Sequence, residues 1–392
     1  MQGAVDPFAP ATLGPITLRN RIIKAATFEG LTPHRLVTDE LIAFHRRVAA
    51  GGVGMSTVAY CAVSREGTTD GHQIVLTEEA LPGLRRLTDA IHDEGAAACA
   101  QIGHAGPVAN PAATKRPALA PSRMLTPWMR RTHAMSEGDI TRVTDDFARG
   151  ARVAAAAGFD VIEVHLGHNY LPSSFMSPKL NRRRDRWGGS VENRARFPRG
   201  VVRSVREAAG DRVALTAKLN MTDGVPGGLA PDDALAIAGM LEADGALDAL
   251  ELTGGSSLAN PMYLFRGDVP LSEFTATLPR ALRLGFRLFG RRFLKSYPFE
   301  EAYFLPLARR FRDALGIPLI LLGGINRLET IRSALDEGFA FVAMARALLR
   351  EPDLIDRMRA GSSLEALCIH CNKCMPTIYT GTRCVLIEPP VH

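Results

Sequence analysis

The sequence predicts an α/β protein, a (β/α)8 TIM barrel with long loop insertions and a Cys-rich C-terminal extension. Strand-like apolar runs alternate with amphipathic helical patterns almost to the end of the chain, which indicates a parallel sheet covered by helices. Eight such pairs fit into 392 residues, a suitable length for one barrel with insertions. A doubly wound sheet is disfavoured because no Gly-x-Gly-x-x-Gly follows the first strand.

Each strand is predicted from a short apolar run, and each helix from apolar residues that return every three or four positions. The expected strands are Ile22–Ala26, Val53–Tyr60, Ala96–Gln101, Phe159–His165, Val213–Leu219, Ala249–Thr253, Pro318–Leu322 and Phe339–Ala343. The expected helices are Asp39–Ala50, Glu78–Glu94, Ile140–Ala157, Ser190–Ala209, Pro231–Asp244, Phe299–Ala314, Arg327–Glu337 and Pro352–Met358. The chemistry of such a barrel takes place at the carboxyl ends of its strands.

Residues 1–360 are expected to form the barrel, and residues 361–392 the Cys-rich extension. Two insertions interrupt the barrel, at about residues 107–138 and 256–298. The first is rich in Pro and Arg, and the second carries a cluster of basic residues. Both are longer than the connections that a barrel requires.

The composition is that of an ordinary globular protein, with 46% hydrophobic and 22% charged residues. No apolar run predicts a transmembrane helix, and the N-terminus lacks a secretory signal pattern, so a cytoplasmic protein is expected. The net charge of +6 equals the number of basic residues between Glu273 and Glu300, a segment that contains no acidic residue. Since the excess charge is confined to this segment, no nucleic-acid partner is expected.

Residues 278–295 predict a basic amphipathic helix, with Arg280, Arg283, Arg287 and Arg291 on one stripe and Leu and Phe residues on the other. Such a helix can contact a membrane surface or an acidic partner. The simpler alternative is a helix that packs its Phe face on the barrel and exposes its Arg face to solvent.

Two histidines and a tyrosine follow the fourth predicted strand. His165 ends the strand, and His168 and Tyr170 lie in the loop beyond it. Imidazole N–H groups can stabilise an anionic oxygen, and a phenol can deliver a proton. As three isolated residues they would more simply be surface or capping histidines beside a packed tyrosine.

The residues that follow resemble the signature of the Old Yellow Enzyme family of FMN-dependent NAD(P)H:flavin oxidoreductases. After the His-x-x-His-x-Tyr cluster, the matching residues are Ser177-Pro178, Asn181, Arg182, Asp185, Gly188-Gly189-Ser190, Glu192-Asn193-Arg194 and Arg196-Phe197. The resemblance extends from Phe8 to about Pro352. It implies that FMN, reduced by NADH or NADPH, passes hydride from N5 to an electron-poor alkene such as an α,β-unsaturated carbonyl compound. His165 and His168 would then hold the substrate oxygen, and Tyr170 would protonate the α carbon.

The resemblance also implies where the flavin lies. Backbone groups of Ala25, Ala26 and Thr27, in the first-strand motif, are expected to meet the flavin edge. The family's Thr or Cys donor to a flavin carbonyl aligns with Phe28, so that donor is lost. Gln101, in Gln-Ile-Gly-His-Ala-Gly, is expected to pair with the flavin pyrimidine ring, because a carboxamide offers both a donor and an acceptor.

Three further positions complete the expected cofactor site. Lys218 would lie beside flavin N1, where a cation stabilises the anionic hydroquinone. Gly323 and Gly324 follow the seventh predicted strand, and Ala345 and Arg346 follow the eighth. Barrels commonly bind phosphate at these two places, and Arg346 adds a charged fork.

Four cysteines near the C-terminus have the spacing of a metal site: Cys368, Cys371, Cys374 and Cys384. Larger relatives, the dienoyl-CoA reductases and trimethylamine dehydrogenase, carry a [4Fe–4S] cluster at this place, and four thiolates can hold one. Reduced thiols and a zinc site are the alternatives. Two other functions therefore stay open, an iron–sulfur flavoenzyme that receives electrons from a partner protein and a non-catalytic flavin redox sensor.

Overall fold

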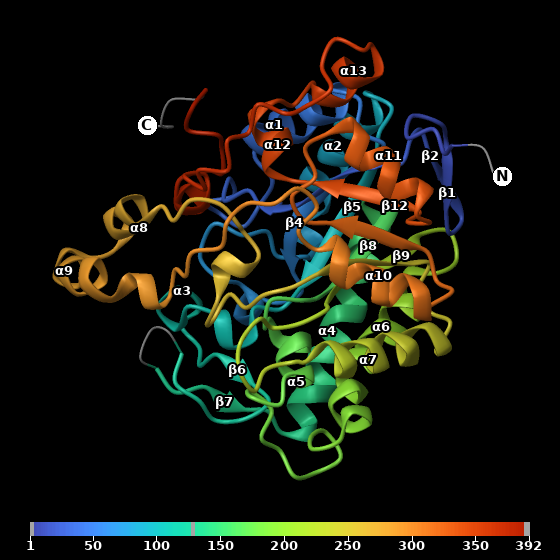
Figure 1. The fold of residues 1–392 in the computed structure, drawn as a ribbon. Coiled ribbons are helices and arrows are strands. Elements are labelled where there is room, and N and C mark those ends of the chain that lie inside the picture. Colours follow the sequence, from blue (N-terminus) through green and yellow to red (C-terminus); the bar gives the residue numbers. More distant parts are fainter. Residues whose placement is uncertain (1–3, 127–129, 388–392) are drawn as a thin grey trace.

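The computed structural model describes residues 4–126 and 130–387 and confirms the predicted barrel (Figure 1). Eight parallel strands close in the order β10-β11-β12-β3-β4-β5-β8-β9. Their bounds are β3 Ile22–Phe28, β4 Met55–Ala62, β5 Ala97–Gly103, β8 Val161–Leu166, β9 Ala214–Asn220, β10 Ala249–Thr253, β11 Leu319–Leu322 and β12 Phe341–Met344. Every predicted strand is present, and the two sets of bounds differ by two residues or fewer at each end.

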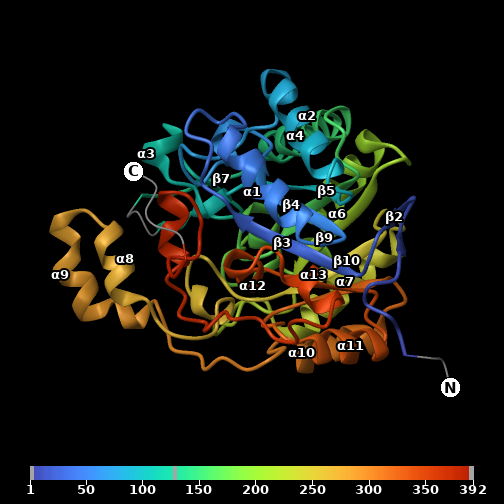
Figure 2. The same cartoon turned by 90° about the horizontal axis from the view of Figure 1, so that it is seen from above.

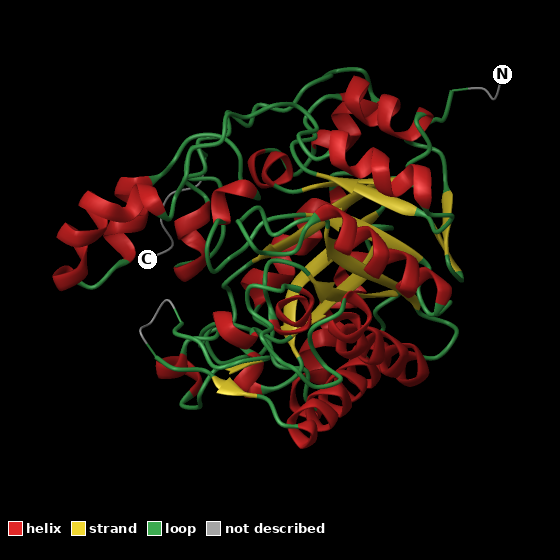
Figure 3. Cartoon of the chain, turned by 60° about the horizontal axis from the view of Figure 1, so that its bottom comes forward, coloured by secondary structure: helices red, strands yellow, loops and turns green. Residues whose placement is uncertain are grey.

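Helices surround the closed sheet on all sides (Figures 2 and 3). They are α1 Asp39–Ala50, α2 Leu81–His92, α4 Glu137–Ala156, α6 Val191–Ala209, α7 Pro231–Ala243, α10 Leu305–Ala314, α11 Leu328–Asp336, α12 Arg346–Arg350 and α13 Leu354–Arg359. Two predictions need correction. The helix expected from Phe299 begins only at Leu305, because Tyr303 and Phe304 instead pack against the loop after β11. The short helix α12, directly after β12, was not predicted.

A hairpin closes the amino end of the barrel. Strands β1 Ala11–Leu13 and β2 Ile16–Leu18 pair in antiparallel register. Leu13 and Leu18 pack with inward-facing barrel residues such as Ile23 and Phe341, and all four are buried. Apolar side chains of the described residues thus fill this end of the barrel, which leaves the carboxyl end as the place for a ligand.

The first insertion forms small elements beside the carboxyl end of the barrel: α3 Pro111–Thr114 and the strands β6 Leu119–Ala120 and β7 His133–Ala134. The loop after β8 adds the short helix α5 Leu171–Met176. The second insertion forms α8 Leu271–Thr277 and α9 Arg280–Phe289, followed by a 3-10 turn Gly290–Arg292. Together α8, α9 and this turn project from the barrel, and residues 271–292 are called the arm below (Figures 1 and 2).

The predicted basic helix is present in the arm, but it is shorter than residues 278–295. The expectation that its apolar face packs on the barrel holds only in part. Phe286 packs toward the barrel in a cluster around Met262, whereas Leu284, Leu288 and Phe289 are 69%, 68% and 58% exposed. None of the described helices combines the length and the apolar composition needed to cross a membrane.

The Cys-rich extension lies along the carboxyl end of the barrel and is tied to the first barrel strand. The backbone N–H of Thr382 donates to the carbonyl of Glu29 at 2.8 Å, and the Thr382 hydroxyl donates to the carbonyl of Phe28. The last residues of β3 are therefore joined to a segment more than 350 positions later in the chain.

Candidate active site

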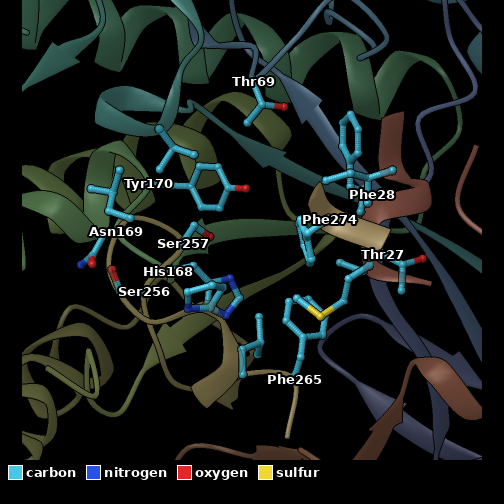
Figure 4. A pocket seen from close by; sticks show the side chains of 18 of the residues that line it. Thr27, Phe28, Thr69, His168, Asn169, Tyr170, Ser256, Ser257, Phe265 and Phe274 are labelled. Carbon is cyan, nitrogen blue, oxygen red and sulfur yellow. The ribbon is translucent and has the colours of Figure 1, made fainter. Parts of the chain in front are cut away.

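A cavity of about 1390 Å³ opens at the carboxyl ends of the barrel strands. Its lining includes all twelve residues that the sequence singled out: His165, His168, Tyr170, Ala25, Ala26, Thr27, Gln101, Lys218, Gly323, Gly324, Ala345 and Arg346. Figure 4 shows Tyr170 and His168 on one side of this pocket and Thr27 and Phe28 on the other. The topology thus gathers residues from six strand ends around one volume.

The rings of His165, His168 and Tyr170 form a compact group. The ring centroid of His165 lies 5.1 Å from that of His168 and 4.7 Å from that of Tyr170. Tyr60, at the end of β4, adds a second phenol whose ring centroid is 5.2 Å from that of Tyr170. All four side chains line the cavity, so their polar atoms can address the same ligand.

A strained turn presents these rings. His168 and Asn169 have positive φ angles of 58° and 61°, a backbone conformation that non-glycine residues rarely adopt. Side chains from the next barrel strand hold the turn. The carboxamide oxygen of Asn220 accepts from the His168 N–H at 3.0 Å, and Asn169 Nδ2 donates to Asp223 Oδ1 at 3.0 Å. Strain that neighbouring groups maintain is typical of functional sites.

Burial sets the protonation of these residues. It lowers the pKa of His168 to about 3 and the pKa of His165 well below its ordinary value, with nearby positive charge acting in the same direction. Burial raises the pKa of Tyr170 to about 12. Near neutral pH the site therefore contains two neutral imidazoles and a phenol that keeps its proton.

The hydrogen bonds of the imidazoles distinguish their ring atoms. His168 Nε2 lies 3.0 Å from the Thr253 hydroxyl, at the end of β10. His165 Nδ1 is buried and has no hydrogen-bond partner among the described residues. A buried polar atom without a partner is costly, which is consistent with a site that a bound ligand completes.

A charged cluster lies under the predicted flavin edge. Gln101 Nε2 donates to Glu163 Oε1 at 2.6 Å, and Lys218 Nζ lies 3.3 Å from the same carboxylate. Lys218 Nζ also contacts the carboxyl of Glu251. Burial, followed by repulsion from Glu163, raises the pKa of Glu251 to about 8. The charge of Lys218 is therefore compensated, which the sequence did not indicate.

The predicted phosphate end is formed by the loops after β11 and β12. Gly323 and Gly324 have φ angles of 111° and 74°, in the region that favours glycine. A Cβ atom at Gly323 would lie 2.5 Å from the Phe304 ring, so packing also requires a glycine there. Arg346 donates to the carbonyl of Arg266 at 2.9 Å and to the carboxamide of Asn372.

The lining residues fit FMN. With Nε2 bound to Glu163, Gln101 retains a carbonyl oxygen that can accept from the N–H of a flavin pyrimidine ring. Arg346 and the backbone around Gly323 can meet the phosphate, and His165 has a polar atom without a partner. The cavity also exceeds the roughly 300–1,000 Å³ of an ordinary ligand pocket, so a second ligand can share it.

The four cysteines Cys368, Cys371, Cys374 and Cys384 line a second, small pocket next to Arg346 and Arg350. His370 and Asn372, between them, have positive φ angles of 58° and 56°, and these fold the segment around that pocket. Burial raises the pKa of the Cys374 thiol to about 12. Among the described residues no group of three or more His, Cys, Asp or Glu side chains is arranged to hold a single metal ion. Four thiols match the donor set of a four-iron cluster and equally that of a four-cysteine zinc site.

Several residues of the site were not found from the sequence. Thr253, Asn220 and Glu251 are single polar residues at strand ends, and no local motif marks them. Their alternation along β9 and β10 points them into the barrel, which can be recognised only once the register of the strands is known. The aromatic residues of the arm that line the cavity were likewise assigned to a packed face instead.

Comparison with known proteins identifies the relatives of this chain. A family described as "NADH:flavin oxidoreductase / NADH oxidase family" matches residues 6–248. The chain is 62% identical to a 4,4'-dithiodibutanoate disulfide reductase from Rhodococcus erythropolis, over 97% of this chain and 94% of that protein. It is 30% identical to a multifunctional alkene reductase/demethylase from Caballeronia cordobensis, over 92% of this chain and 50% of that protein.

A solved 2-naphthoyl-CoA reductase complex has the same fold, with a TM-score of 0.82 and 24% identity over 98% of this chain and 57% of that chain. The chain spans about half the length of several curated relatives that it matches, including a metal reductase and an N,N-dimethylglycine/sarcosine dehydrogenase.

Proposed function

This chain belongs to the NADH:flavin oxidoreductase / NADH oxidase family, and we propose that it uses NADH or NADPH to reduce the activated C=C bond of an α,β-unsaturated carbonyl or related compound. It is a flavin oxidoreductase of the Old Yellow Enzyme type, and bound FMN supplies the hydride. The observation that carries the proposal is the group of His165, His168 and Tyr170 around one part of the cavity.

The two imidazoles act on the substrate oxygen. His165 and His168 are neutral, so each offers an N–H that can donate to a carbonyl or nitro oxygen. As hydride arrives at the β carbon, negative charge moves onto that oxygen, and both hydrogen bonds strengthen. The buried surroundings increase their effect, because the site excludes much of the competing water.

Tyr170 completes the reaction by giving its proton to the α carbon. One hydride and one proton are thereby added across the double bond, and the phenolate recovers a proton from solvent. Tyr170 keeps its proton at neutral pH, since burial raises its pKa to about 12. We propose this role for Tyr170 rather than Tyr60, because Tyr60 donates its hydroxyl to the carbonyl of Gly67 at 3.0 Å.

The test is the variant Tyr170→Phe with 2-cyclohexen-1-one as acceptor. We expect turnover to fall by roughly 10²–10⁴, the usual contribution of a general acid, while FMN content and reduction by NAD(P)H stay at wild-type levels. Tyr60→Phe is the matched control and should retain most of the activity. Alkene reduction by Tyr170→Phe at the wild-type rate would refute the proposed role.

Organic disulfides are a second candidate class of acceptor. The relative of 62% identity, which this chain matches along nearly its whole length, is a disulfide reductase. In that reaction hydride adds to one sulfur, the S–S bond breaks and the other sulfur leaves as a thiolate. Because a thiol has a pKa of about 8.5, the thiolate can leave without a proton from Tyr170.

The two acceptor classes can therefore be separated with the same variant. Wild-type enzyme is assayed with 2-cyclohexen-1-one and with 4,4'-dithiodibutanoate, and Tyr170→Phe is assayed with both. If alkenes are the substrates, the wild type prefers the enone and the variant loses that activity. A preference for the disulfide that survives in Tyr170→Phe would favour the second class.

The cysteine pocket bears on the source of electrons. If Cys368, Cys371, Cys374 and Cys384 hold a [4Fe–4S] cluster, anaerobically purified protein will contain about four iron and four sulfide per chain. A cluster would also support an exchange of electrons with a partner protein. Iron-free protein with full NAD(P)H-dependent activity would leave the cysteines without that role.

A further inference from the structure

We propose that the arm forms a binding lobe for the apolar tail of the acceptor, next to the catalytic residues. The lobe is defined by Phe274, Leu278, Leu282, Phe286, Phe289 and Phe293, all of which line the same cavity as His168 and Tyr170. The inference rests on the proposed function and extends it, because it assigns a substrate class: electron-poor compounds that carry an uncharged hydrocarbon chain or ring system.

The chemistry of the lobe is uniform. The lining residues contributed by positions 271–293 are Phe274, Thr277, Leu278, Ala281, Leu282, Gly285, Phe286, Phe289, Gly290 and Phe293. All are uncharged. The arginines of the same helix lie on its other face, since residues 280, 283 and 287 follow one stripe along a helix. The face turned to the cavity is therefore suited to hydrocarbon and not to an anion.

The lobe is continuous with the catalytic group. Phe274, from α8, lies in the same pocket as His168 and Tyr170, together with Phe28 and Phe265 from the barrel side (Figure 4). Phe274 and Phe286 pack in one apolar cluster with Phe265, which fixes the base of the arm to the barrel. A substrate held by its oxygen at the histidines can thus extend its far end along the arm.

The volume leaves space for such a tail. The cavity of about 1390 Å³ is larger than the range expected for one small ligand. The outer lobe is also incompletely covered: Leu282 and Phe289 line the cavity while they are 59% and 58% exposed. Exposed apolar side chains of this size lower their contact with water when a hydrocarbon chain covers them.

The experiment measures binding to the FMN-loaded, oxidised protein by calorimetry. The ligands are saturated 2-alkanones from 2-pentanone to 2-decanone, which present a carbonyl to the histidines but contain no reducible C=C bond. Failure of the lobe can therefore be told apart from failure of the proposed reaction. We expect the Kd to fall about fourfold for each added methylene that enters the lobe, which corresponds to about 0.8 kcal/mol per methylene.

Two variants on one helix make the test specific. Leu282→Asp places a charge in the lobe and should abolish the gain in affinity from longer chains. Leu284→Asp is the matched control, because Leu284 lies on the same helix and is also largely exposed, at 69% against 59% for Leu282, but does not line the cavity. A Kd that is independent of chain length in the wild type overturns the proposal, and so does equal damage from both substitutions.

A charged ligand tests the commitment to an apolar tail. 8-Oxononanoate has the length of 2-nonanone but ends in a carboxylate. We expect it to bind at least tenfold more weakly than 2-nonanone, because an apolar lobe cannot solvate the charge. Equal or tighter binding of the carboxylate would show that the arginines of the arm reach the ligand, and it would overturn the apolar assignment.

Discussion

Replacement of His168 by alanine gives the sharpest test of the proposed chemistry. The substitution removes one of two N–H groups expected to hold the substrate oxygen. It leaves His165, whose ring centroid lies 5.1 Å away, as the remaining donor. Since the hydrogen bonds of His168 run to Asn220 and Thr253 and not to the predicted flavin residues, the variant should still load FMN.

The expected loss follows from the state of the ring. Burial lowers the pKa of His168 to about 3, so the donor that is lost is a neutral N–H and not a cation. Removal of one such donor to a developing oxyanion raises the barrier by about 3–4 kcal/mol, or roughly 10²–10³ in rate. Water entering the vacated space restores part of this stabilisation, so we expect a loss near 100-fold.

The assay is the reoxidation of anaerobically reduced enzyme by 2-cyclohexen-1-one, with FMN content measured in parallel. The pH profile provides a second readout. Because the pKa of His168 is lowered to about 3, its imidazole stays neutral at all higher pH values, so its titration should not affect wild-type turnover between pH 5 and 8. Our reasoning is refuted if FMN-loaded His168→Ala retains most of its rate, or if wild-type activity changes with an apparent pKa near 6.5 that the variant lacks.

Three further predictions concern residues that support the site. Glu251→Gln should become more stable relative to the wild type as pH rises, because the folded carboxyl stays protonated up to about pH 8 whereas the unfolded one ionises from about 4.5. Between these two pH values the difference in unfolding free energy between variant and wild type should grow by about 1.4 kcal/mol per pH unit. Urea unfolding of both proteins in saturating FMN measures it, and the same difference at pH 6 and pH 8 would contradict the prediction. Arg346→Ala should weaken FMN binding roughly 10–100-fold, which is the contribution of a charge-assisted hydrogen bond. Arg350 lies outside the main cavity, so Arg350→Ala is the control and should bind FMN normally in the same fluorescence titration. Thr253→Val should lower alkene turnover about tenfold without loss of FMN, because His168 Nε2 loses the hydroxyl that orients it. Thr253→Ser keeps a hydroxyl and should restore the rate. Equal rates for the wild type and both variants would exclude this positioning role.

Much of the fold could be predicted because barrel strands are buried on both faces. The run Leu319–Leu322 is apolar throughout, and Val161–Leu166 is buried throughout and mostly apolar. The alternation of such runs with helices leaves few other topologies. Helix ends were less predictable. The pattern from Phe299 to Ala314 is helical in composition, yet Tyr303 and Phe304 are needed against Gly323 and are drawn out of the helix by tertiary packing.

The residues of the candidate site likewise differ in how far the sequence alone could identify them. Residues in contiguous motifs, such as His165 and Gln101, were found because their neighbours in the sequence identify them. Residues that reach the site because of the strand register, such as Glu251 beside Lys218, were not found from the sequence. The arm shows a third case, because its apolar face was expected to meet the protein and instead lines the open side of a cavity.

The contacts of the C-terminal segment have a consequence for how this protein is made. Thr382 is joined to the end of β3, and Asn372 receives a hydrogen bond from Arg346. On the ribosome, β3 emerges well before its partner Thr382, which lies 354 positions after Phe28. The two hydrogen bonds of Thr382 at the mouth of the barrel can therefore form only once this residue has been translated, so the last residues of β3 lack them while the intervening chain is made.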